Sequence, residues 1–401
     1  MSTTSQVATS MPPADPAHPV IGAATSLLDA YTPDARFLAT PGRTLLAHGD
    51  VRRVPHDERS LDERVNATLA EAAAAGQESP VVIGAIPFDH GAPAALSVPA
   101  ELRTAPPLAS DPLIALPVGV PASADWRIRP VPEPEAYGAG VASAVERMWR
   151  GEFSKVVLAR TLELTSSAPL DLPAMLQRLA RRDPVGYTFA LPTAPGRTLI
   201  GASPELLVSR KGSQVTANPL AGSTPRSADL AEDVRRAATL LESAKDLHEH
   251  AVVVDAVHQA LAPHCSRLTV PARPTLIRTA TMWHLSTTVT GTLAAPDTSA
   301  LSLACALHPT PAVCGTPTAT ARQVIAETEP FDRGFFTGVV GWGDAQGNGE
   351  WVVTIRCAEA EERTLRLYAG AGVVAASEPE AETAETAAKF RTFLGAVGTE
   401  L

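Results

Sequence analysis

The fold class can be inferred from residues 338–356, which read Gly338-Val-Val-Gly-Trp-Gly-Asp-Ala-Gln-Gly-Asn-Gly-Glu-Trp-Val-Val-Thr-Ile-Arg356. Two runs rich in valine and tryptophan flank a Gly/Asn-rich segment at 344–349. Such runs favour β-strands, and the segment between them places the two runs at hairpin distance. Because a hairpin joins antiparallel neighbours, the sequence predicts an antiparallel sheet in this region.

Similar strand-like runs occur elsewhere in the chain, together with three segments that have helical periodicity. The runs are Thr44-Leu-Leu-Ala47, Val81-Val-Ile-Gly-Ala-Ile86, Lys155-Val-Val-Leu-Ala-Arg-Thr-Leu162 and Thr364-Leu-Arg-Leu-Tyr368, and the helices are expected at 135–150, 229–261 and 377–390. Since strands outnumber helices, we expect an α+β fold with sheet at the centre and helices outside. Residues 1–20 are rich in Ser, Thr, Pro and Ala and are expected to be disordered, whereas 21–401 should form one domain.

The composition is typical of a soluble globular protein. Apolar residues make up 45% of the 401 residues and charged residues 19%, while the formal net charge is −10. This charge argues against nucleic acid and anionic membranes as partners, because both require clustered Lys and Arg. A signal peptide begins with a positively charged region, but neither Lys nor Arg precedes Arg36. The four cysteines lack CxxC spacing. We therefore expect a cytoplasmic protein, and a monomer.

Two pairs of carboxylates are spaced three residues apart on predicted helices: Asp246 with Glu249, and Glu382 with Glu385. Residues at this spacing share a helix face, so two such faces could converge on a hard cation such as Mg²⁺, which takes oxygen ligands. The alternative is a pair of ordinary solvated helix surfaces. Lys389, four residues after Glu385, is compatible with a surface ion pair. Spacing alone leaves both interpretations open.

Three further charged residues lie in or beside strand-like runs. Lys155 begins an apolar strand, so it is either a solvated residue at a sheet edge or a buried lysine able to act as a base. Glu205 follows Gly201-Ala-Ser-Pro and is either a catalytic carboxyl or a solvated group at the start of a strand. Arg356 ends its run and is either a fork for a substrate carboxylate or a charge at the strand end.

Other motifs have simpler explanations. Gly370-Ala-Gly-Val-Val-Ala375 fits the dinucleotide fingerprint, which would suggest a nicotinamide-dependent oxidoreductase. However, Pro379 interrupts the expected helix and no acidic residue stands about twenty positions on. His248 and His250 lack the spacing of a zinc helix and are expected to face solvent. His284 and His308 lie beside apolar residues, as structural histidines do.

Taken together, these segments and several others resemble the chorismate-binding enzyme family, and within it the isochorismate synthases of siderophore and menaquinone pathways. The resemblance extends from about Phe37 to the C-terminus. Its densest blocks are Phe153-Ser-Lys-Val-Val-Leu-Ala-Arg160, Gly201-Ala-Ser-Pro-Glu-Leu-Leu207, Pro219-Leu-Ala-Gly-Ser223, Ser243-Ala-Lys-Asp-Leu-His-Glu-His250, Met282-Trp-His-Leu285, Leu307-His-Pro-Thr-Pro-Ala-Val-Cys-Gly315, Glu329-Pro-Phe-Asp-Arg333 and Tyr368-Ala-Gly-Ala-Gly372. So many blocks in one order make a chance match implausible.

The resemblance implies a β-sandwich flanked by helices, with the active site in a cleft, and a role for each matching residue. Lys155 would be the general base that activates water, and Glu205 the general acid. Glu249 and Glu385 would hold Mg²⁺, supported by Asp246 and Glu382. The positions implied in binding the substrate, chorismate, are Gly222, Ser223, His284, Ala312, Val313, Phe336, Arg356, Tyr368, Gly370 and Lys389.

Single residues separate the branches of this family. Relatives that use ammonia typically carry glutamine in place of Lys155, and aminodeoxychorismate synthases carry lysine in place of Ala221. Salicylate synthases share the lysine and glutamate, but they tend to have threonine in place of Ser223 and a threonine in the loop that here reads Pro311-Ala-Val-Cys-Gly315. These differences favour isochorismate synthase, with salicylate synthase as the alternative enzyme.

Overall fold

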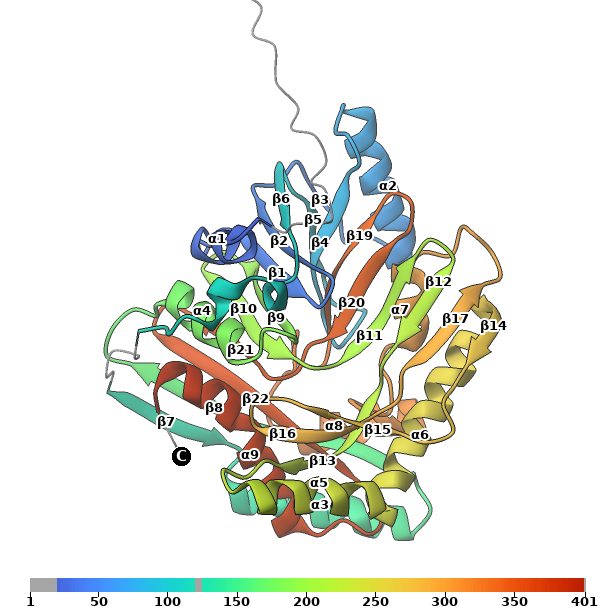
Figure 1. Ribbon diagram of the computed structural model, residues 1–401. Coiled ribbons are helices and arrows are strands. Elements are labelled where there is room, and N and C mark those ends of the chain that lie inside the picture. The colour runs from blue at the N-terminus through green and yellow to red at the C-terminus, as the bar shows by residue number, and fades with distance from the viewer. Residues whose placement is uncertain (1–19, 120–124, 400–401) are drawn as a thin grey trace, which may run out of the picture.

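A computed structural model describes residues 20–119 and 125–399, so the prediction of a disordered arm at 1–20 falls almost wholly outside the described residues. Three sheets form the centre of the molecule (Figure 1), and every strand pair in the described residues is antiparallel. Solved relatives share this α+β architecture, as reported below, and the predicted fold class is confirmed.

The first sheet has ten strands in the order β18-β8-β22-β21-β10-β9-β1-β2-β6, with β7 also pairing with β8. Its strands are β1 (Arg36–Thr40), β2 (Arg43–His48), β6 (Glu101–Ala105), β7 (Trp126–Val131), β8 (Lys155–Ser166), β9 (Tyr187–Ala194), β10 (Arg197–Ser203), β18 (Gly315–Thr316), β21 (Cys357–Glu361) and β22 (Thr364–Val373).

The second sheet has nine strands in the order β14-β17-β12-β11-β20-β19-β4-β5-β3, and a third has the order β13-β16-β15. The nine strands are β3 (Arg52–Arg53), β4 (Val81–Ile86), β5 (Ala95–Val98), β11 (Leu206–Lys211), β12 (Gln214–Ala217), β14 (Cys265–Thr269), β17 (Val289–Leu293), β19 (Val339–Asp344) and β20 (Gly349–Val353). The small sheet contains β13 (Leu220–Pro225), β15 (Thr275–Arg278) and β16 (Met282–Ser286). The predicted hairpin at 338–356 is confirmed, because β19 pairs with β20.

The two large sheets pack face to face. A buried cluster between them takes side chains from both, including Phe189 and Leu38 of the first sheet and Trp342 and Ile83 of the second. The outer face of the first sheet is covered by α1 (Ala23–Asp29), α4 (Leu172–Arg182) and α9 (Pro379–Val397), and that of the second by α2 (Leu61–Ala74), α6 (Ala244–Leu261) and α7 (Ala300–Leu307). The expected sandwich with helices outside is therefore present.

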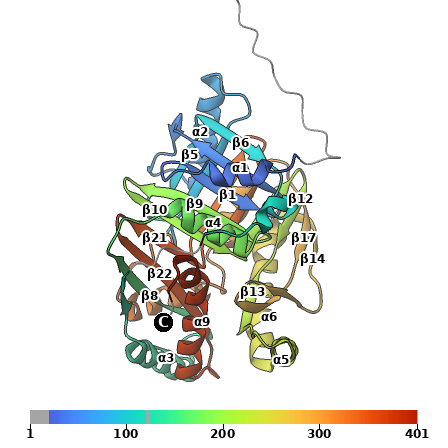
Figure 2. The same cartoon turned by 60° about the vertical axis from the view of Figure 1, so that its left-hand side comes forward.

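The remaining helices lie near the ends of the sheets. They are α3 (Pro134–Trp149), α5 (Leu230–Glu242) and α8 (Thr318–Thr328), with short 3₁₀ turns at Leu108–Ser110, Pro112–Ala115 and Ala262–His264. No helix in the described part of the chain is long and apolar enough to cross a membrane. Figure 2 shows α9 with α3 on one side of the lower part of the molecule, and α6 with α5 on the other. Strand β13 contacts both α6 and α9.

The prediction of one continuous helix at 229–261 is wrong. The chain leaves the helical conformation at Ser243, which separates α5 from α6 and has φ −68° and ψ 110°. The Ser243 side chain accepts a hydrogen bond from the backbone N–H of Asp246, as an N-cap serine does. This break matters for the site, because it places Asp246 and Glu249 in the first two turns of a new helix.

Candidate active site

One cavity gathers most of the residues to which sequence analysis assigned a role. The predicted residues that line it are Glu205, Gly222, Ser223, Glu249, His284, Ala312, Val313, Phe336, Arg356, Tyr368, Gly370, Glu385 and Lys389. Lys155, Asp246 and Glu382 do not line it. Lys155 contacts the lining residue Glu249, Asp246 packs against the lining residue Gly222, and Glu382 contacts Lys245. The lining also includes residues that had no predicted role: Val157, Leu220, Ala221, Thr337, Ile355, Ala369 and Gly372.

Glu205 and Arg356 are placed by two neighbouring chain segments that cross between the large sheets. The first runs from β10 to β11 through Glu205, and the second runs from β20 to β21 through Arg356. Backbone hydrogen bonds join the crossings: Ala202 N donates to Arg356 O at 3.1 Å, and Val353 N donates to Glu205 O at 3.1 Å. Arg356 has φ 51°, a conformation that costs a non-glycine residue energy and here turns its side chain at the corner.

The Glu205 carboxyl is suited to donate a proton. It is 3% exposed, and burial raises its pKa to about 7, although Lys155, Arg356 and Lys389 oppose the shift. Leu220 N donates a long hydrogen bond of 3.4 Å to Glu205 Oε1. Desolvation disfavours the carboxylate, so a substantial fraction of this group carries a proton at neutral pH. A solvated glutamate at the start of a strand would not.

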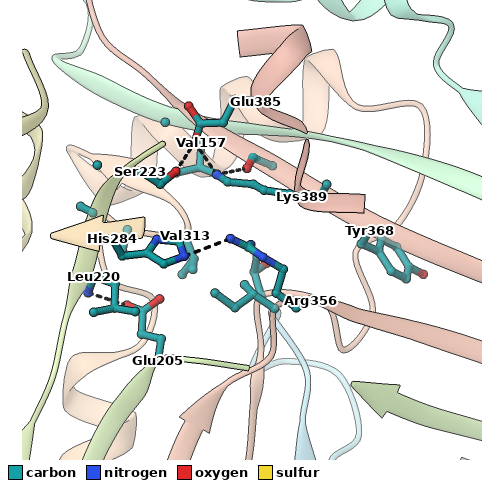
Figure 3. A pocket seen from close by; sticks show the side chains of 18 of the residues that line it. Val157, Glu205, Leu220, Ser223, His284, Val313, Arg356, Tyr368, Glu385 and Lys389 are labelled. Atoms are coloured by element: carbon teal, nitrogen blue, oxygen red, sulfur yellow. Dashed lines mark hydrogen bonds and ion pairs between the residues drawn. The ribbon is translucent and has the colours of Figure 1, made fainter. Parts of the chain in front are cut away.

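Arg356 presents unused donors in the same cavity. Its guanidinium is buried, and Nη2 donates to His284 Nε2 at 3.4 Å (Figure 3). Burial together with the charges of Arg356 and Lys389 lowers the pKa of His284 well below its usual value, so the imidazole is neutral and accepts this bond. Arg356 Nε has no hydrogen-bond partner among the described residues. A buried guanidinium with free N–H groups fits an incoming carboxylate.

A second cationic group lies across the cavity from Glu205 (Figure 3). Lys389 Nζ contacts Glu385 Oε1 at 2.6 Å and donates to Gly370 O at 2.8 Å. Ser223 Oγ donates to the same Glu385 oxygen at 3.0 Å. Ser223 is itself the cross-strand partner of His284 in the small sheet. The small sheet thus connects the two cationic groups of the cavity.

Lys155 is buried, so a solvated position at a sheet edge is not what the structure shows. Its side chain is 1% exposed, and Nζ lies 2.9 Å from Glu249 Oε1, although the contact is not aligned as a hydrogen bond. Nζ makes no hydrogen bond to any described residue. Gly372 permits this arrangement, because a Cβ there would lie 2.2 Å from Glu249 Oε1. The second glycine of the apparent dinucleotide motif therefore makes room for the Lys155–Glu249 pair.

Four acidic residues of α6 and α9, the two predicted pairs, form one electrostatic group. Burial, with repulsion from Glu249 and Glu385, raises the pKa of Asp246, and burial, with repulsion from Glu385, raises that of Glu382. Burial also favours the neutral form of Glu385, but Lys389, Ser223 and Lys245 outweigh it and hold its pKa below the usual value. Glu382 contacts Lys245 at 2.7 Å.

This donor set fits a hard divalent cation by its chemistry. Carboxylate oxygens are the ligands that Mg²⁺ prefers, and Glu249 and Glu385 both line the cavity. In the described residues no three acidic, histidine or cysteine side chains are arranged to enclose an ion. Three of the four acids instead contact a lysine each: Glu249, Glu385 and Glu382.

Two stacked aromatic rings form part of the wall around the apolar part of the cavity. Phe336 stacks on Tyr368 with ring centroids 4.9 Å apart. The Tyr368 hydroxyl points away from the cavity (Figure 3) and donates to Glu359 at 3.0 Å.

His308 is a buried structural histidine as predicted, and its Nε2 lies 2.7 Å from Thr337 O. The prediction that His248 and His250 both face solvent is wrong for His250, which is 2% exposed and contacts Thr287.

Sequence comparisons identify relatives of the whole chain. The family model described as "Chorismate binding enzyme" matches residues 121–398. Isochorismate synthase DhbC of Bacillus subtilis is 55% identical over 388 residues, which covers 94% of this chain and 97% of the relative. Isochorismate synthase EntC of Escherichia coli is 40% identical over 376 residues, covering 91% and 95%.

Structural comparisons give the same result. The crystal structure of putative 2,3-dihydroxybenzoate-specific isochorismate synthase DhbC from Bacillus anthracis superposes with a TM-score of 0.88 at 50% identity, covering 94% of this chain and all of that one. The menaquinone-specific isochorismate synthase MenF of Escherichia coli shares the fold, with a TM-score of 0.79 at 24% identity and coverage of 93% and 91%. The family expected from the sequence blocks is confirmed: the chain belongs to the chorismate-binding enzymes.

Proposed function

We propose that this protein is an isochorismate synthase, which replaces the C4 hydroxyl of chorismate by a hydroxyl that enters from water at C2. The observation that carries the proposal is Glu205, a buried carboxyl with a pKa of about 7 in a cavity that also presents the cationic side chains of Arg356 and Lys389. The full-length relatives named above support it. The chemistry needs one proton removed from water and one delivered to the leaving hydroxyl.

Two residues divide these proton transfers. Lys155 Nζ, in its neutral form, takes a proton from the attacking water as the oxygen bonds to C2. Glu205 gives its proton to the C4 oxygen, which leaves as water, and the double bonds of the ring shift between the two carbons. One proton is released by the attacking water to Lys155 and one is delivered by Glu205 to the leaving oxygen, so no net proton is gained or lost. The reaction is therefore an isomerisation and needs no redox cofactor. A catalytic role for the buried Lys155 explains why Nζ has no well-aligned partner in its surroundings.

The substrate's carboxylates are bound by the cationic groups of the cavity. Arg356 offers its free Nε and its fork to one carboxylate, while Lys389 and the backbone at Gly370 lie near the other. Gly222 and Ser223 of β13, with His284 beside them, form the wall between the two groups. The apolar residues Ala312, Val313 and Phe336, with the ring of Tyr368, surround the ring of the substrate.

The cofactor in this proposal is Mg²⁺, held by Glu249 and Glu385, with Asp246 and Glu382 behind them. When bound, the ion offsets the charge of a substrate carboxylate and fixes the position of the ring. To hold the ion, the carboxylate of Glu249 would turn away from Lys155, and the carboxylate of Glu385 would turn away from Lys389. The like-charge repulsion among these acids, described above, supports the assignment, because a divalent cation relieves it.

We also propose that residues 21–401 act as one catalytic domain and that the product feeds a siderophore of the 2,3-dihydroxybenzoate type. The Bacillus anthracis relative, described as a putative 2,3-dihydroxybenzoate-specific isochorismate synthase, supports the second point. Salicylate synthase remains the alternative enzyme, and Ser223 and the loop at 311–315 argue against it. A nicotinamide-dependent oxidoreductase is disfavoured, because Gly370 and Gly372 lie within the antiparallel strand β22 instead of a strand-to-helix turn.

One assay tests the proposal directly. The purified protein is incubated with chorismate and Mg²⁺, and the products are separated by chromatography. We expect isochorismate, approaching a fixed ratio with chorismate, and pyruvate at the non-enzymatic background. Stoichiometric pyruvate with salicylate would identify a salicylate synthase, and the absence of any turnover of chorismate would overturn the proposal.

A further inference from the structure

The strand that begins with Lys155 has a gap along one edge, beside the cavity. On that edge β18 pairs with Lys155 and Val156, and Cys314 O accepts from Val157 N at 2.7 Å. Further along, β7 pairs with β8 only from Thr161 onward. Between the segments paired with β18 and β7, the C=O of Val157 and the N–H of Ala159 point outward from this edge. No neighbouring strand in the described residues bonds to these two groups. Buried backbone groups of this kind need other partners.

An ion pair fills the gap. Glu329 is the C-cap residue directly after α8, and Arg333 follows four residues later. Both are buried, with relative exposures of 8% and 3%. Arg333 Nη2 donates to Val157 O at 2.8 Å, and Glu329 Oε1 accepts from Ala159 N at 2.8 Å. Nε and Nη2 of Arg333 also donate to Glu329 at 2.8 and 2.5 Å. The pair thus offers β8 one donor and one acceptor, as a neighbouring strand would.

The same guanidinium holds two other segments of the cavity wall. Arg333 Nη1 donates to Val313 O at 2.8 Å and to Thr337 Oγ1 at 3.2 Å. Thr337 has φ 57°, so its loop is held in a conformation that needs outside support. Val157, Val313 and Thr337 all line the cavity. The five N–H donors of Arg333 are all used, and a lysine, with three donors and no planar fork, cannot replace them.

We infer that the Glu329–Arg333 ion pair is the positioning element of the active site, which sets the spacing between the strand of Lys155 and the opposite wall of the cavity. The inference rests on the proposed function, because it concerns the placement of the base relative to the substrate. Neither residue lines the cavity, so neither is a catalytic residue. The pair acts through Val157, two residues from Lys155, and through the loops of Val313 and Thr337.

The test is Arg333→Lys, compared with Arg36→Lys as a matched control. Arg36 is also buried and pairs with Asp50 at 2.8 Å, but it lies in β1, and neither residue of this pair lines the active-site cavity. Both variants lose a buried guanidinium, so both should unfold at a lower temperature. Only Arg333→Lys should lower kcat, by about 10²-fold, since a misplacement of about 1 Å has this effect. KM for chorismate should change by less than about fivefold, because Arg356 and Lys389 remain in place.

A purely structural role predicts a different result. If the two variants showed equal kcat at equal loss of thermal stability, or if Arg333→Lys raised KM alone, the positioning role would be refuted. Should Arg333→Lys fail to fold, Glu329→Gln is measured against the same control, since it keeps the volume and an acceptor for Ala159 N. Failure of the proposed function is distinct, because the wild-type protein would then convert no chorismate.

Discussion

The proton on Glu205 is the most directly testable part of the mechanism, and Glu205→Gln is the substitution that removes it. Glutamine keeps the shape of the side chain but cannot ionise or donate a carboxyl proton. In the wild-type protein the pKa of Glu205 is raised from 4.5 to about 7, chiefly by burial. The variant should therefore differ from the wild type in two independent quantities, turnover and the pH dependence of stability.

The size of the stability effect follows from the shift in pKa. Because the folded pKa is the higher one, the folded state retains the proton between pH 4.5 and 7 while the unfolded state loses it. The contribution of Glu205 to stability is thus fully present below pH 4.5 and is lost as the pH rises through 7. At about 1.4 kcal/mol per pKa unit, the wild type should lose roughly 2–3 kcal/mol from this group between pH 5 and 8.

The assay is denaturant unfolding of both proteins at pH 5 and pH 8, with Glu78→Gln as a control on an exposed loop residue. The wild type and the control should lose the same stability between these pH values, and Glu205→Gln should lose roughly 2–3 kcal/mol less. In parallel, kcat/KM of the wild type should fall as the pH rises above about 7, as the acid ionises. Glu205→Gln should have lost about 10²–10⁴-fold in turnover.

Two results would count against this reasoning. The first is an equal loss of unfolding free energy by the wild type and Glu205→Gln between pH 5 and 8. The pKa of Glu205 would then not be raised in the folded protein, and its role as the acid would lose its basis. If the variant retained wild-type turnover, the proton would come from another group, whatever the stability data showed.

The other predictions concern the base, the ion and the product. Lys155→Ala should remain folded and lose about 10²–10⁴-fold in kcat, and an active variant would return the lysine to a structural role. Chelation should abolish activity and added Mg²⁺ restore it, while Glu249→Ala and Glu385→Ala should each weaken Mg²⁺ binding measured by calorimetry; an unchanged affinity would remove that residue from the ligand set. The early product should be isochorismate alone, because Ser223 lacks the methyl group of threonine and the loop at 311–315 carries no threonine hydroxyl. Salicylate in the first minutes would contradict the assignment.

Several features of the fold could be predicted from local sequence. The hairpin at 338–356 combines β-forming residues with turn residues, and β4 has the predicted bounds, Val81–Ile86. The break at Ser243 was also readable in principle, since serine followed three residues later by an acidic residue is typical of a helix start. The helical spacing of apolar residues in α5 continues into α6, so this spacing alone gives no sign of the break.

The environment of single residues could not be predicted in the same way. Whether Lys155 is solvated or buried depends on α6 and β22, which pack around it from distant parts of the sequence. The same holds for Glu385 and Lys389, whose spacing fits an ordinary surface pair although both line the cavity. Gly372 was recognisable as a motif residue. The reason why a glycine is needed there is the closeness of Glu249, which only the three-dimensional structure shows. Family resemblance supplied what spacing could not.

The two crossings between the sheets have a consequence for how such an enzyme can be altered. Glu205 and Arg356 lie on adjacent segments whose backbones are tied together, and each continues into a strand of both large sheets. An insertion on either side would shift the pairing register of two sheets at once. Ala312 and Val313 lie in a loop, and Ser223 lies in the separate three-stranded sheet. Changes of product are therefore expected to be accommodated more readily at Ser223, Ala312 and Val313 than at Glu205 and Arg356, which lie where the two large sheets are joined.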